Sequence, residues 1–346
     1  MLHTLDPFVF EFAPGWGVRW YGLSYVAGFV AGWLLLRLLA RRGLAMVPAD
    51  RVADAMLWIV AGVLIGGRLG YVLLYKPEYL WTFEAEFPWW AVLAINRGGM
   101  ASHGGMIGVI LAAWRISRGW RDDDCTVRGR CHPLHVMDLM ALIAPPGLLF
   151  GRVANFVNGE LPGRVVARPG EPAPWWSVKF PQEIVSGHES FRTPEQEQAV
   201  DNIVSRYMLP GDDFAAGFER MLRALRHGGE EADRLAAELS PLISARAPSQ
   251  LLQALCEGVV VGAVVWTVGV AMGRLRSPGV VGAWFLVSYG VLRIATEFVR
   301  LPDADLAVQR VLGLSRGQWF SAVMVAVGLL VMAVPRLRGK TGGPGT

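Results

Sequence analysis

Apolar runs long enough to cross a membrane recur along the chain and are separated mostly by short polar connections. A helix needs about twenty apolar residues to span the ~30 Å hydrocarbon core of a bilayer. The first run begins at Tyr21, and Arg37, Arg41 and Arg42 mark its end. By this criterion we predict seven membrane-spanning helices, at approximately residues 21–40, 52–75, 99–116, 134–156, 249–272, 280–296 and 318–334.

One long polar segment interrupts this pattern. Residues 160–247 lie between the fourth and fifth apolar runs, with prolines early in the segment and a charged, helix-like pattern at residues 214–239. Such a segment is too polar to lie in hydrocarbon. We therefore predict a single membrane domain over residues 1–346, in which residues 160–247 form a head or long loop inserted between spans four and five.

The composition supports a membrane protein. Hydrophobic residues make up 53% of the 346 residues and charged residues 18%, which is below the roughly 25% of an average soluble domain. The formal net charge is +4, but the basic residues are spread in small groups between the apolar runs, which argues against a nucleic-acid-binding face. The predicted fold class is an all-α polytopic membrane protein with about seven transmembrane helices.

The basic groups indicate an orientation, because short cytoplasmic loops are enriched in lysine and arginine. With seven spans, all of the basic groups fall on one side of the membrane. This predicts an N-terminus outside, a C-terminus in the cytoplasm and an extracytoplasmic head. The groups are Arg41, Arg42 and Arg51; Arg118, Arg121, Arg128 and Arg130; Arg274 and Arg276; and Arg336, Arg338 and Lys340.

Polar residues within the predicted spans gather near the outer half of the membrane. A charged group near the centre of a span costs about 2.5–3.5 kcal/mol on insertion scales, so such residues either pair with one another or serve a function. Arg293 and Glu297 lie four residues apart on one face of the sixth span and could neutralise each other. The set is Tyr21, Arg68, His103, Arg152, Asn155, Asn158, Glu160, Arg293 and Glu297.

The arginines of this set, together with Arg300, outnumber its glutamates. An anion is therefore expected at the site, and the planar fork of arginine matches a phosphate with two hydrogen bonds. In a membrane the obvious phosphate is that of a phospholipid head group. His103, between Ser102 and two glycines, is either a hydrogen-bonded structural group or a general acid or base.

Two cysteines and two histidines lie close together in and after the third connection, and could in principle bind zinc. They are Cys125, Cys131, His132 and His135. Their spacing is not that of a standard zinc finger, and free thiols are normal in a cytoplasmic loop. We expect no metal at this segment.

Five motifs occur in order along the predicted spans. The longest runs from Gly151 to Arg164 and reads Gly-Arg-(two residues)-Asn-Phe-(one residue)-Asn-Gly-Glu-(two residues)-Gly-Arg. The others are Trp20–Leu23, Gly66–Tyr71, Ser102–Gly105 and Arg293–Asp303. In content, order and spacing the set resembles the bacterial prolipoprotein diacylglyceryl transferase family.

The resemblance implies an enzyme of the bacterial cytoplasmic (inner) membrane, with membrane lipid around it. It would transfer the diacylglyceryl group of phosphatidylglycerol to the lipobox cysteine of a prolipoprotein, forming a thioether and releasing glycerol phosphate, with no metal or organic cofactor. Arg152 and Arg293 would hold the phosphate and stabilise its developing charge. His103 or Glu160 would act as acid or base, unless the thiolate forms without a protein base. The substrate-binding set would be Tyr21, Arg68, Arg152, Asn155, Asn158, Gly163, Arg293 and Glu297.

Departures from the family pattern keep other functions open. Before the fifth span the family usually has His-Pro-(Ser/Thr)-Gln-Leu-Tyr-Glu, whereas this chain has Ala247, Leu252 and Gln253 at the histidine, tyrosine and glutamate positions. The head is also longer than is usual in the family. One alternative is a protein that binds or transports an anionic lipid without chemistry, although the chain shows no internal repeat of the kind common in transporters. The other is a diverged relative without transfer activity.

Overall fold

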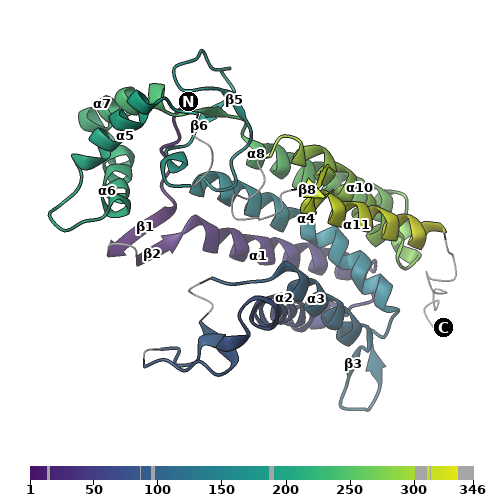
Figure 1. Cartoon of the computed structure of the whole chain (residues 1–346). Helices are drawn as coiled ribbons and strands as arrows, with labels where there is room; N and C mark the ends of the chain where they lie inside the picture. The colour runs from purple at the N-terminus through teal and green to yellow at the C-terminus, as the bar shows by residue number, and fades with distance from the viewer. Residues whose placement is uncertain are drawn as a thin grey trace. The chain divides into compact units, whose positions relative to one another are not determined.

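The computed structural model describes residues 1–13, 16–85, 87–94, 98–186, 191–300, 310–311 and 313–333, and in these residues the chain is mostly helical (Figure 1). Its apolar helices include α3 (Ser102–Ser117) and α11 (Arg316–Ala333). Five helical segments of the described chain are long and apolar enough to cross a membrane, so the protein is a polytopic membrane protein of the predicted mainly helical class. The five are α1 (Trp20–Arg41), Ala49–Tyr75, α4 (Pro133–Asn158), Ser249–Ala271 and α10 (Val280–Glu297).

Each of the seven predicted apolar runs contains a helix in the structure. The third helix begins at Ser102 rather than at residue 99, and the last begins at Arg316 rather than at residue 318. The second consists of a 3-10 turn, Ala49–Arg51, followed by α2 (Val52–Tyr75). How many of these helices cross the bilayer stays a prediction, and the basic residues at 336–340 lie outside the described residues.

The chain divides into two compact units. The first unit comprises Met1–Val26, Leu148–Val260 and Tyr289–Val323, and the second comprises Ala27–Gly147, Val261–Ser288 and the described residues after 323. The polar residues predicted for the site are divided between the units. Arg68 and His103 belong to the second unit, and the other predicted site residues belong to the first.

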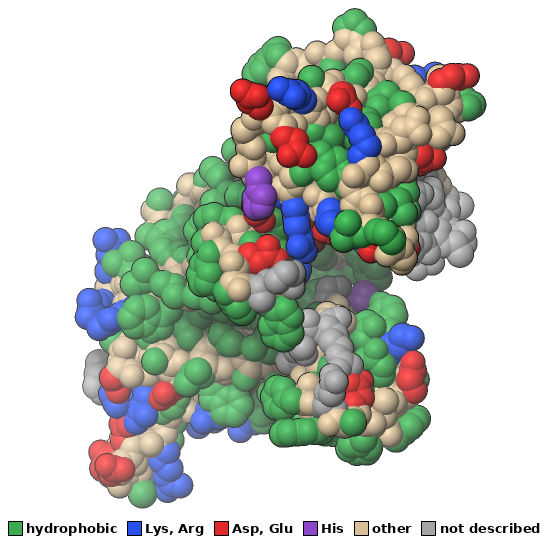
Figure 2. Space-filling view, turned by 90° about the vertical axis from the view of Figure 1, so that its left-hand side faces the viewer, with side chains coloured by type: hydrophobic (Ala, Val, Ile, Leu, Met, Phe, Trp, Pro, Cys, Tyr) green, Lys and Arg blue, Asp and Glu red, His purple; other side chains and the backbone are tan. Residues whose placement is uncertain are grey.

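The head belongs to the first unit and contains three helices that lie together in Figure 1, α5 (Pro194–Ser205), α6 (Phe214–His227) and α7 (Gly229–Leu239). On the face shown in Figure 2, acidic and basic side chains are scattered over the head at the top of the view. The apolar faces of the three helices turn inward and form a core of their own. Its buried residues are Val200, Ile203, Val204, Phe218, Met221, Leu222, Leu225, Leu235, Leu239 and Ile243.

Local sequence signals set the ends of the head helices. Thr193 caps α5 in a capping box with Gln196, and the carboxylate of Asp213 accepts the Ala216 N–H at the start of α6. The charged pattern at residues 214–239 forms two helices rather than one. The reason is that Gly228 and Gly229 both have positive φ, a conformation that ends a helix and suits glycine.

A small antiparallel sheet brings together the two ends of the head. Its strand order is β5 (Val165–Ala167), β7 (Ala245–Arg246) and β6 (Val178–Lys179), and 3-10 turns at Pro181–Ile184 and Ser240–Leu242 lie beside it in sequence. The start of the chain joins this sheet, because the His3 N–H donates to the Lys179 carbonyl at 2.8 Å and the Lys179 N–H donates to the Met1 carbonyl at 2.9 Å.

A hairpin precedes the first long helix. Strand β1 (Phe8–Ala13) pairs antiparallel with β2 (Trp16–Arg19), and β2 runs directly into α1. The side chains of Phe10, Phe12 and Trp16 are exposed. Aromatic side chains of this kind are favourable at the boundary between lipid and water.

The helical segment Ser249–Ala271 is not a uniform α-helix. It consists of α8 (Ser249–Gln253), a π-helical stretch Ala254–Val260, α9 (Val261–Trp266) and a second π-helical stretch Thr267–Ala271. π-Helical turns inside longer helices are frequent at functional sites. The first stretch contains Glu257, whose side chain is fully buried.

In the second unit, α2 and α3 approach each other through glycines. A Cβ atom added at Gly66 would lie 2.4 Å from the carbonyl oxygen of Gly104, and one added at Gly108 would lie 1.9 Å from that of Gly62. Both distances are far below van der Waals contact with backbone atoms that cannot rotate away. Small residues therefore allow this pair of helices to pack closely.

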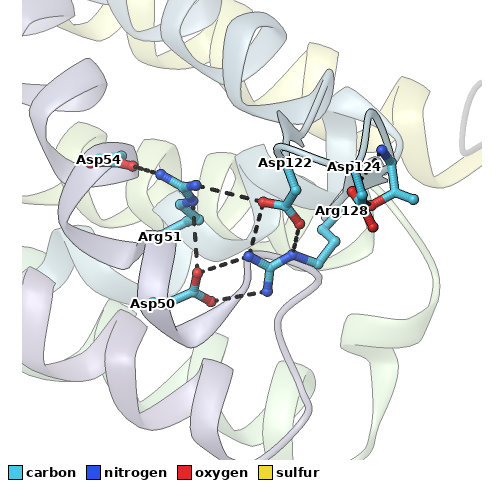
Figure 3. Close-up of polar contacts among 7 residues, drawn as sticks. Asp50, Arg51, Asp54, Asp122, Asp124 and Arg128 are labelled. Atoms are coloured by element: carbon cyan, nitrogen blue, oxygen red, sulfur yellow. Dashed lines mark hydrogen bonds and ion pairs between the residues drawn. The ribbon is translucent and has the colours of Figure 1, made fainter.

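Ion pairs fasten the connection after α3 to the start of α2 within the second unit. The connection forms a short hairpin of β3 (Trp120–Arg121) and β4 (Val127–Arg128). Figure 3 shows the Arg128 guanidinium between Asp50 and Asp122, both of which it contacts, while Arg51 contacts Asp50, Asp54 and Asp122. The hydrogen bonds from Arg128 lower the pKa of the Asp122 carboxyl group.

The two histidines considered for zinc each accept a hydrogen bond from a backbone N–H. His132 accepts the Leu134 N–H on Nδ1, and His135 accepts the Met46 N–H on Nε2, each at 3.2 Å. Among the described residues, no group of three or more His, Cys, Asp or Glu side chains is placed to hold a metal ion. Short elements complete the described chain: 3-10 turns Pro77–Leu80, Ala91–Leu93 and Arg274–Arg276, and strands β8 (Arg310–Val311) and β9 (Leu314–Ser315).

Candidate active site

Three elements of the first unit bring a buried carboxylate between two arginines. Glu257, from the π-helical stretch, accepts a hydrogen bond on Oε2 from Nε of Arg152 near the end of α4, at 2.9 Å. Its other oxygen, Oε1, lies 3.6 Å from Nη1 of Arg293 on α10. Glu257 has no exposed side-chain surface, whereas the arginines are 18% and 11% exposed. The carboxylate is thus enclosed, and its partners retain access to a further ligand.

A second carboxylate extends this cluster along α10. Arg293 Nη2 lies 3.3 Å from Glu297 Oε2, one turn further along the helix, so the predicted pairing of these two residues is confirmed. Arg300 Nη1 lies 3.8 Å from the same oxygen, and the Ser315 hydroxyl donates to Glu297 Oε1 at 3.0 Å. Arginines and glutamates therefore alternate through a largely buried network, which is how charges in such surroundings are compensated.

The end of α4 holds a third carboxylate through its own amides. Glu160 accepts one hydrogen bond from Asn155 Nδ2 at 3.1 Å and one from Asn158 Nδ2 at 3.2 Å. Its backbone N–H donates to the Asn155 carbonyl, and its carbonyl accepts from Gln250 Nε2. The chain turns here at Gly159, which has a φ of +70°. The structure thus brings three of the predicted site residues into contact.

Two tyrosines complete the electrostatic surroundings of Arg152. Tyr21, at the start of α1, interacts electrostatically with Arg152 and Glu160. Tyr289, on α10 one turn before Arg293, interacts with Arg152, Glu257 and Arg293, and shares a hydrogen bond with Arg152. The structure thus brings the predicted Tyr21 to the cluster and adds a tyrosine that the sequence reasoning did not select.

Gly163 has a structural reason to be glycine. A Cβ atom at this position would lie 2.2 Å from the Ala247 carbonyl oxygen and 3.0 Å from that of Val299. The segment is held on both sides, since Arg164 N–H donates to the Val299 carbonyl and its own carbonyl accepts from Ala247 N–H. This close backbone packing connects the base of the head to the end of α10, next to the Glu297–Arg300 pair.

A buried ion pair from the head reaches the same turn. Glu183 accepts from Nε of Arg246 at 2.7 Å, and Arg246 Nη1 donates to the Gly163 carbonyl at 3.4 Å. Arg192 lies 3.3 Å from the other oxygen of Glu183, which also accepts the backbone N–H and the hydroxyl of Ser244. Glu183 and Arg246 are almost fully buried, so the head contributes a buried polar network to the position of Gly163.

Arg68, in the second unit, is saturated by backbone carbonyls. It is 4% exposed, and four of the five N–H groups of a guanidinium are used. These bonds hold the backbone at residues 91–92 and 98–99 against the Arg68 side chain. The acceptors are the carbonyls of Val92 at 2.7 Å from Nε, Gly98 and Gly99 at 2.7 and 3.0 Å from Nη1, and Ala91 at 2.6 Å from Nη2.

His103 lies in the first turn of α3 in the second unit and is partly buried. The role of either residue of the second unit in substrate binding stays a prediction. The contacts of Arg68 also show a structural role, because its guanidinium N–H groups hold backbone carbonyls that precede α3.

Glu257 and Tyr289 were missed by the sequence reasoning. Glu257 lies inside the predicted fifth span, and an ionisable residue in an apolar span is itself a functional signal. Including Glu257 adds a negative charge to the count of arginines and glutamates from which an anion was inferred. Within the described cluster, three arginines (152, 293 and 300) face two glutamates (257 and 297), which leaves a smaller excess of positive charge than the sequence count suggested.

The fold and the site together define a multi-pass membrane protein with a buried polar site that is rich in arginine. The chain belongs to the prolipoprotein diacylglyceryl transferase family, whose profile matches residues 7–334. This confirms the family indicated by the motifs.

Named relatives match almost end to end. The phosphatidylglycerol–prolipoprotein diacylglyceryl transferase of Bdellovibrio bacteriovorus is 38% identical, with 96% of this chain and 94% of the relative covered. Proteins with the same description are 35% identical in Xanthomonas axonopodis pv. citri, with 97% and 93% covered, and 32% identical in Ruegeria pomeroyi, with 95% and 92% covered. The relatives named as transferases therefore align with this chain over nearly their whole length.

Proposed function

We propose that this protein transfers the diacylglyceryl group of phosphatidylglycerol to the lipobox cysteine of prolipoproteins, the first step of bacterial lipoprotein maturation. Membership of the family and the names of its relatives support this activity. The observation that carries it is the arrangement of Arg152 and Arg293 around Glu257, because two guanidinium groups held in fixed positions suit a phosphate.

The reaction replaces the carbon–oxygen bond between the diacylglyceryl group and the phosphate with a carbon–sulfur bond. The cysteine sulfur attacks the glyceryl carbon that bears the phosphate, a carbon–sulfur bond forms, and the carbon–oxygen bond to the phosphate breaks. The thiol loses its proton, and glycerol phosphate leaves with the electron pair of the broken bond. Negative charge therefore accumulates on the phosphate in the transition state, and preorganised cationic donors stabilise charge that develops in this way.

In this proposal the two arginines hold the phosphate, and their contacts support that role. Glu257 and Tyr289 each engage Arg152, and because a guanidinium carries five N–H groups, donors remain for an anion. Arg293 Nη1 has no hydrogen-bond partner among the described residues and faces Glu257 Oε1 at 3.6 Å. A phosphate oxygen would supply the acceptor that this nitrogen lacks. Glu257 fixes both guanidinium groups before the substrate arrives.

The remaining first-unit residues orient the head group and move the proton. Asn155, Asn158 and Tyr21 lie around Glu160 and Arg152 and would donate hydrogen bonds to the substrate. Glu160 uses two of the roughly four acceptor positions of a carboxylate for its amide partners, so positions remain for the thiol proton. His103 is the alternative base. Gly163 and Glu297 would support the site by holding its backbone and its arginines, and Arg68 would hold the backbone that precedes α3.

The membrane placement that accompanies this function follows the positive-inside pattern. We propose the bacterial inner membrane, an outer N-terminus, a cytoplasmic C-terminus and seven spans, with residues 160–247 as an extracytoplasmic head of one membrane domain. The predicted outer side is where the site, at the end of α4 and beside the head, would meet an exported prolipoprotein.

A transfer assay with purified protein tests the proposal. The protein in detergent micelles is mixed with phosphatidylglycerol and a lipobox peptide, and mass spectrometry measures the diacylglyceryl adduct while the released glycerol phosphate is quantified. We expect Arg152→Lys and Arg293→Lys to lower the rate by roughly 100-fold or more, because a point charge cannot reproduce a planar fork. Arg234→Lys, on the exposed face of α7 where Arg234 pairs with Glu230, is the matched control.

The assay also separates the alternatives. A peptide with serine in place of the lipobox cysteine should give no adduct. If the wild-type protein gave no adduct, or if both lysine variants matched its rate, the assignment of this activity to the arginine pair would be wrong.

A further inference from the structure

Gln253 is buried with part of its amide unsatisfied. The side chain is 1% exposed, and its Nε2 has no hydrogen-bond partner among the described residues. A buried donor without a partner destabilises a folded protein, and in a native structure it calls for a specific explanation. Gln253 lies one turn before Glu257 on the same helical segment, so the site offers such an explanation.

The buried face of this segment is well defined. Gln250, Gln253 and Glu257 are all buried, at helical spacing along one side. Leu251, Leu252 and Leu255 lie between them in sequence and are exposed. The Gln253 amide therefore points to the inside of the first unit, away from the leucine face.

Contacts of neighbouring residues with α4 and with the turn after it locate Gln253. These contacts show that the segment runs antiparallel to α4. Gln253 lies between the contacts at 250 and 257, so by interpolation it lies opposite α4 near Phe156. Three contacts fix this register: Gln250 Nε2 to the Glu160 carbonyl at 2.5 Å, Glu257 Oε2 to Arg152 Nε at 2.9 Å, and a Cβ atom at Gly258, which would lie 2.6 Å from Leu149 Cβ.

By this register, the position of Gln253 lies between two groups that the proposed reaction uses. Arg152 lies on one side along α4 and Glu160 on the other, with Asn155 between them. Asn155 directs its amide to Glu160. The Gln253 amide adds a neutral donor at this point without adding a negative charge beside the arginines.

We propose that Gln253 binds the substrate, donating a hydrogen bond from Nε2 to an anionic phosphate oxygen of the donor lipid held by Arg152. This assignment rests on the proposed function for the identity of the lipid. A hydrogen bond to a charged oxygen is stronger than one between neutral groups. Gln253 thereby supplies to the substrate the donor that the protein alone leaves unsatisfied.

The first test compares Gln253→Met with the wild-type protein at varied phosphatidylglycerol and saturating peptide. Methionine keeps the length of the side chain and removes the donor. We expect the KM for phosphatidylglycerol to rise roughly 10- to 100-fold in Gln253→Met, the range for a lost hydrogen bond to a charged group. Unfolding of Gln253→Met should be no easier than that of the wild type, since an unsatisfied group is removed.

The second test measures lipid binding without transfer. The affinity of each variant in detergent micelles is measured for phosphatidylglycerol and for diacylglycerol with the same acyl chains, which lacks the phosphate. We expect Gln253→Met to weaken binding of phosphatidylglycerol and to leave diacylglycerol unchanged. Leu252→Ala, on the exposed face of the same turn, is the control and should change neither affinity.

The outcomes separate this inference from the proposed function. A wild-type protein that binds phosphatidylglycerol through Gln253 but forms no adduct would disprove the transfer activity and leave the Gln253 contact standing. Equal affinities of Gln253→Met and wild type for phosphatidylglycerol, with an unchanged KM, would show that Gln253 does not bind the phosphate, whatever the activity of the wild type.

Discussion

Removing Glu257 is the most direct perturbation of the site, because this one carboxylate contacts both arginines that are proposed to hold the phosphate. Glu257→Gln keeps the shape of the side chain and removes its charge. Glu257→Leu removes the charge and both acceptor oxygens. In either variant the arginines keep their charges and lose their shared partner in surroundings where no side-chain surface of Glu257 is exposed.

The size of the effect follows from the two distances. With an effective dielectric constant of about 20, Coulomb's law gives roughly 6 kcal/mol for the Arg152 pair at 2.9 Å and roughly 5 kcal/mol for the Arg293 pair at 3.6 Å. Desolvation of the ions offsets much of this attraction, so breaking a buried pair costs about 3–5 kcal/mol. We expect the lower value for Glu257→Gln, whose carbonyl oxygen still accepts the Arg152 Nε–H, and the upper value for Glu257→Leu.

Two measurements check this expectation. The free energy of unfolding of the detergent-solubilised protein should fall by these amounts, and the transfer rate should fall roughly 100-fold as the arginines lose their fixed position. Glu238→Gln, which breaks an exposed pair with Arg206 in the head, is the matched control and should change neither quantity measurably. Wild-type stability and rate in Glu257→Leu would refute the reasoning, because the arginines would then not depend on this carboxylate.

Three further outcomes are expected. Burial lowers the pKa of His3 from 6.5 to about 4. Between these values the unfolded chain binds a proton that the folded chain does not, so the free energy of unfolding should fall by roughly 3 kcal/mol as the pH drops from about 6.5 to about 4. His3→Gln should flatten this pH dependence of unfolding. Gly163→Ala should lower the unfolding free energy by about 1–3 kcal/mol or prevent folding, because its Cβ meets the Ala247 carbonyl, whereas Gly22→Ala, with open space around it, should not. Arg68→Lys should destabilise the protein by about 1–3 kcal/mol in the same assay, since an ammonium cannot reach four carbonyls in a planar fan.

Hydropathy predicted the helices well because the requirement for apolar residues in a span is strong and local. Every predicted run contains a helix, and the starts of the third and last helices moved by a few residues. The π-helical stretches between Ala254 and Ala271 were not predictable in this way, since they depend on how this segment packs rather than on its average hydropathy. In the head, the two adjacent glycines at 228 and 229 are the sequence signal for a break between α6 and α7. The continuous charged pattern on both sides of them led to the prediction of one helical segment.

The polar part of the site was predicted unevenly, for physical reasons. Asn155 and Asn158 lie in the last turn of α4 and Glu160 directly follows the helix, so their closeness in sequence already brings them together. Glu257 and Arg152 are in contact although 105 positions separate them in the sequence. A local sequence pattern cannot predict such a contact. The atomic explanation of Gly163, a carbonyl oxygen of residue 247 where a Cβ would stand, likewise depends on tertiary packing.

The inference of an anion survives the discovery of Glu257, but on different grounds. The sequence argument relied on an excess of arginines, and part of that excess disappears once Glu257 is paired and Arg68 is seen to be bound by backbone carbonyls. What remains is geometric, since Arg293 Nη1 and Glu257 Oε1 face each other beyond hydrogen-bond distance and neither has another partner among the described residues. In the proposed mechanism a phosphate would therefore share these guanidinium groups with Glu257. Such sharing would make the carboxylate a competitor of the substrate as well as a support for the arginines, and it would favour release of the glycerol phosphate product after transfer.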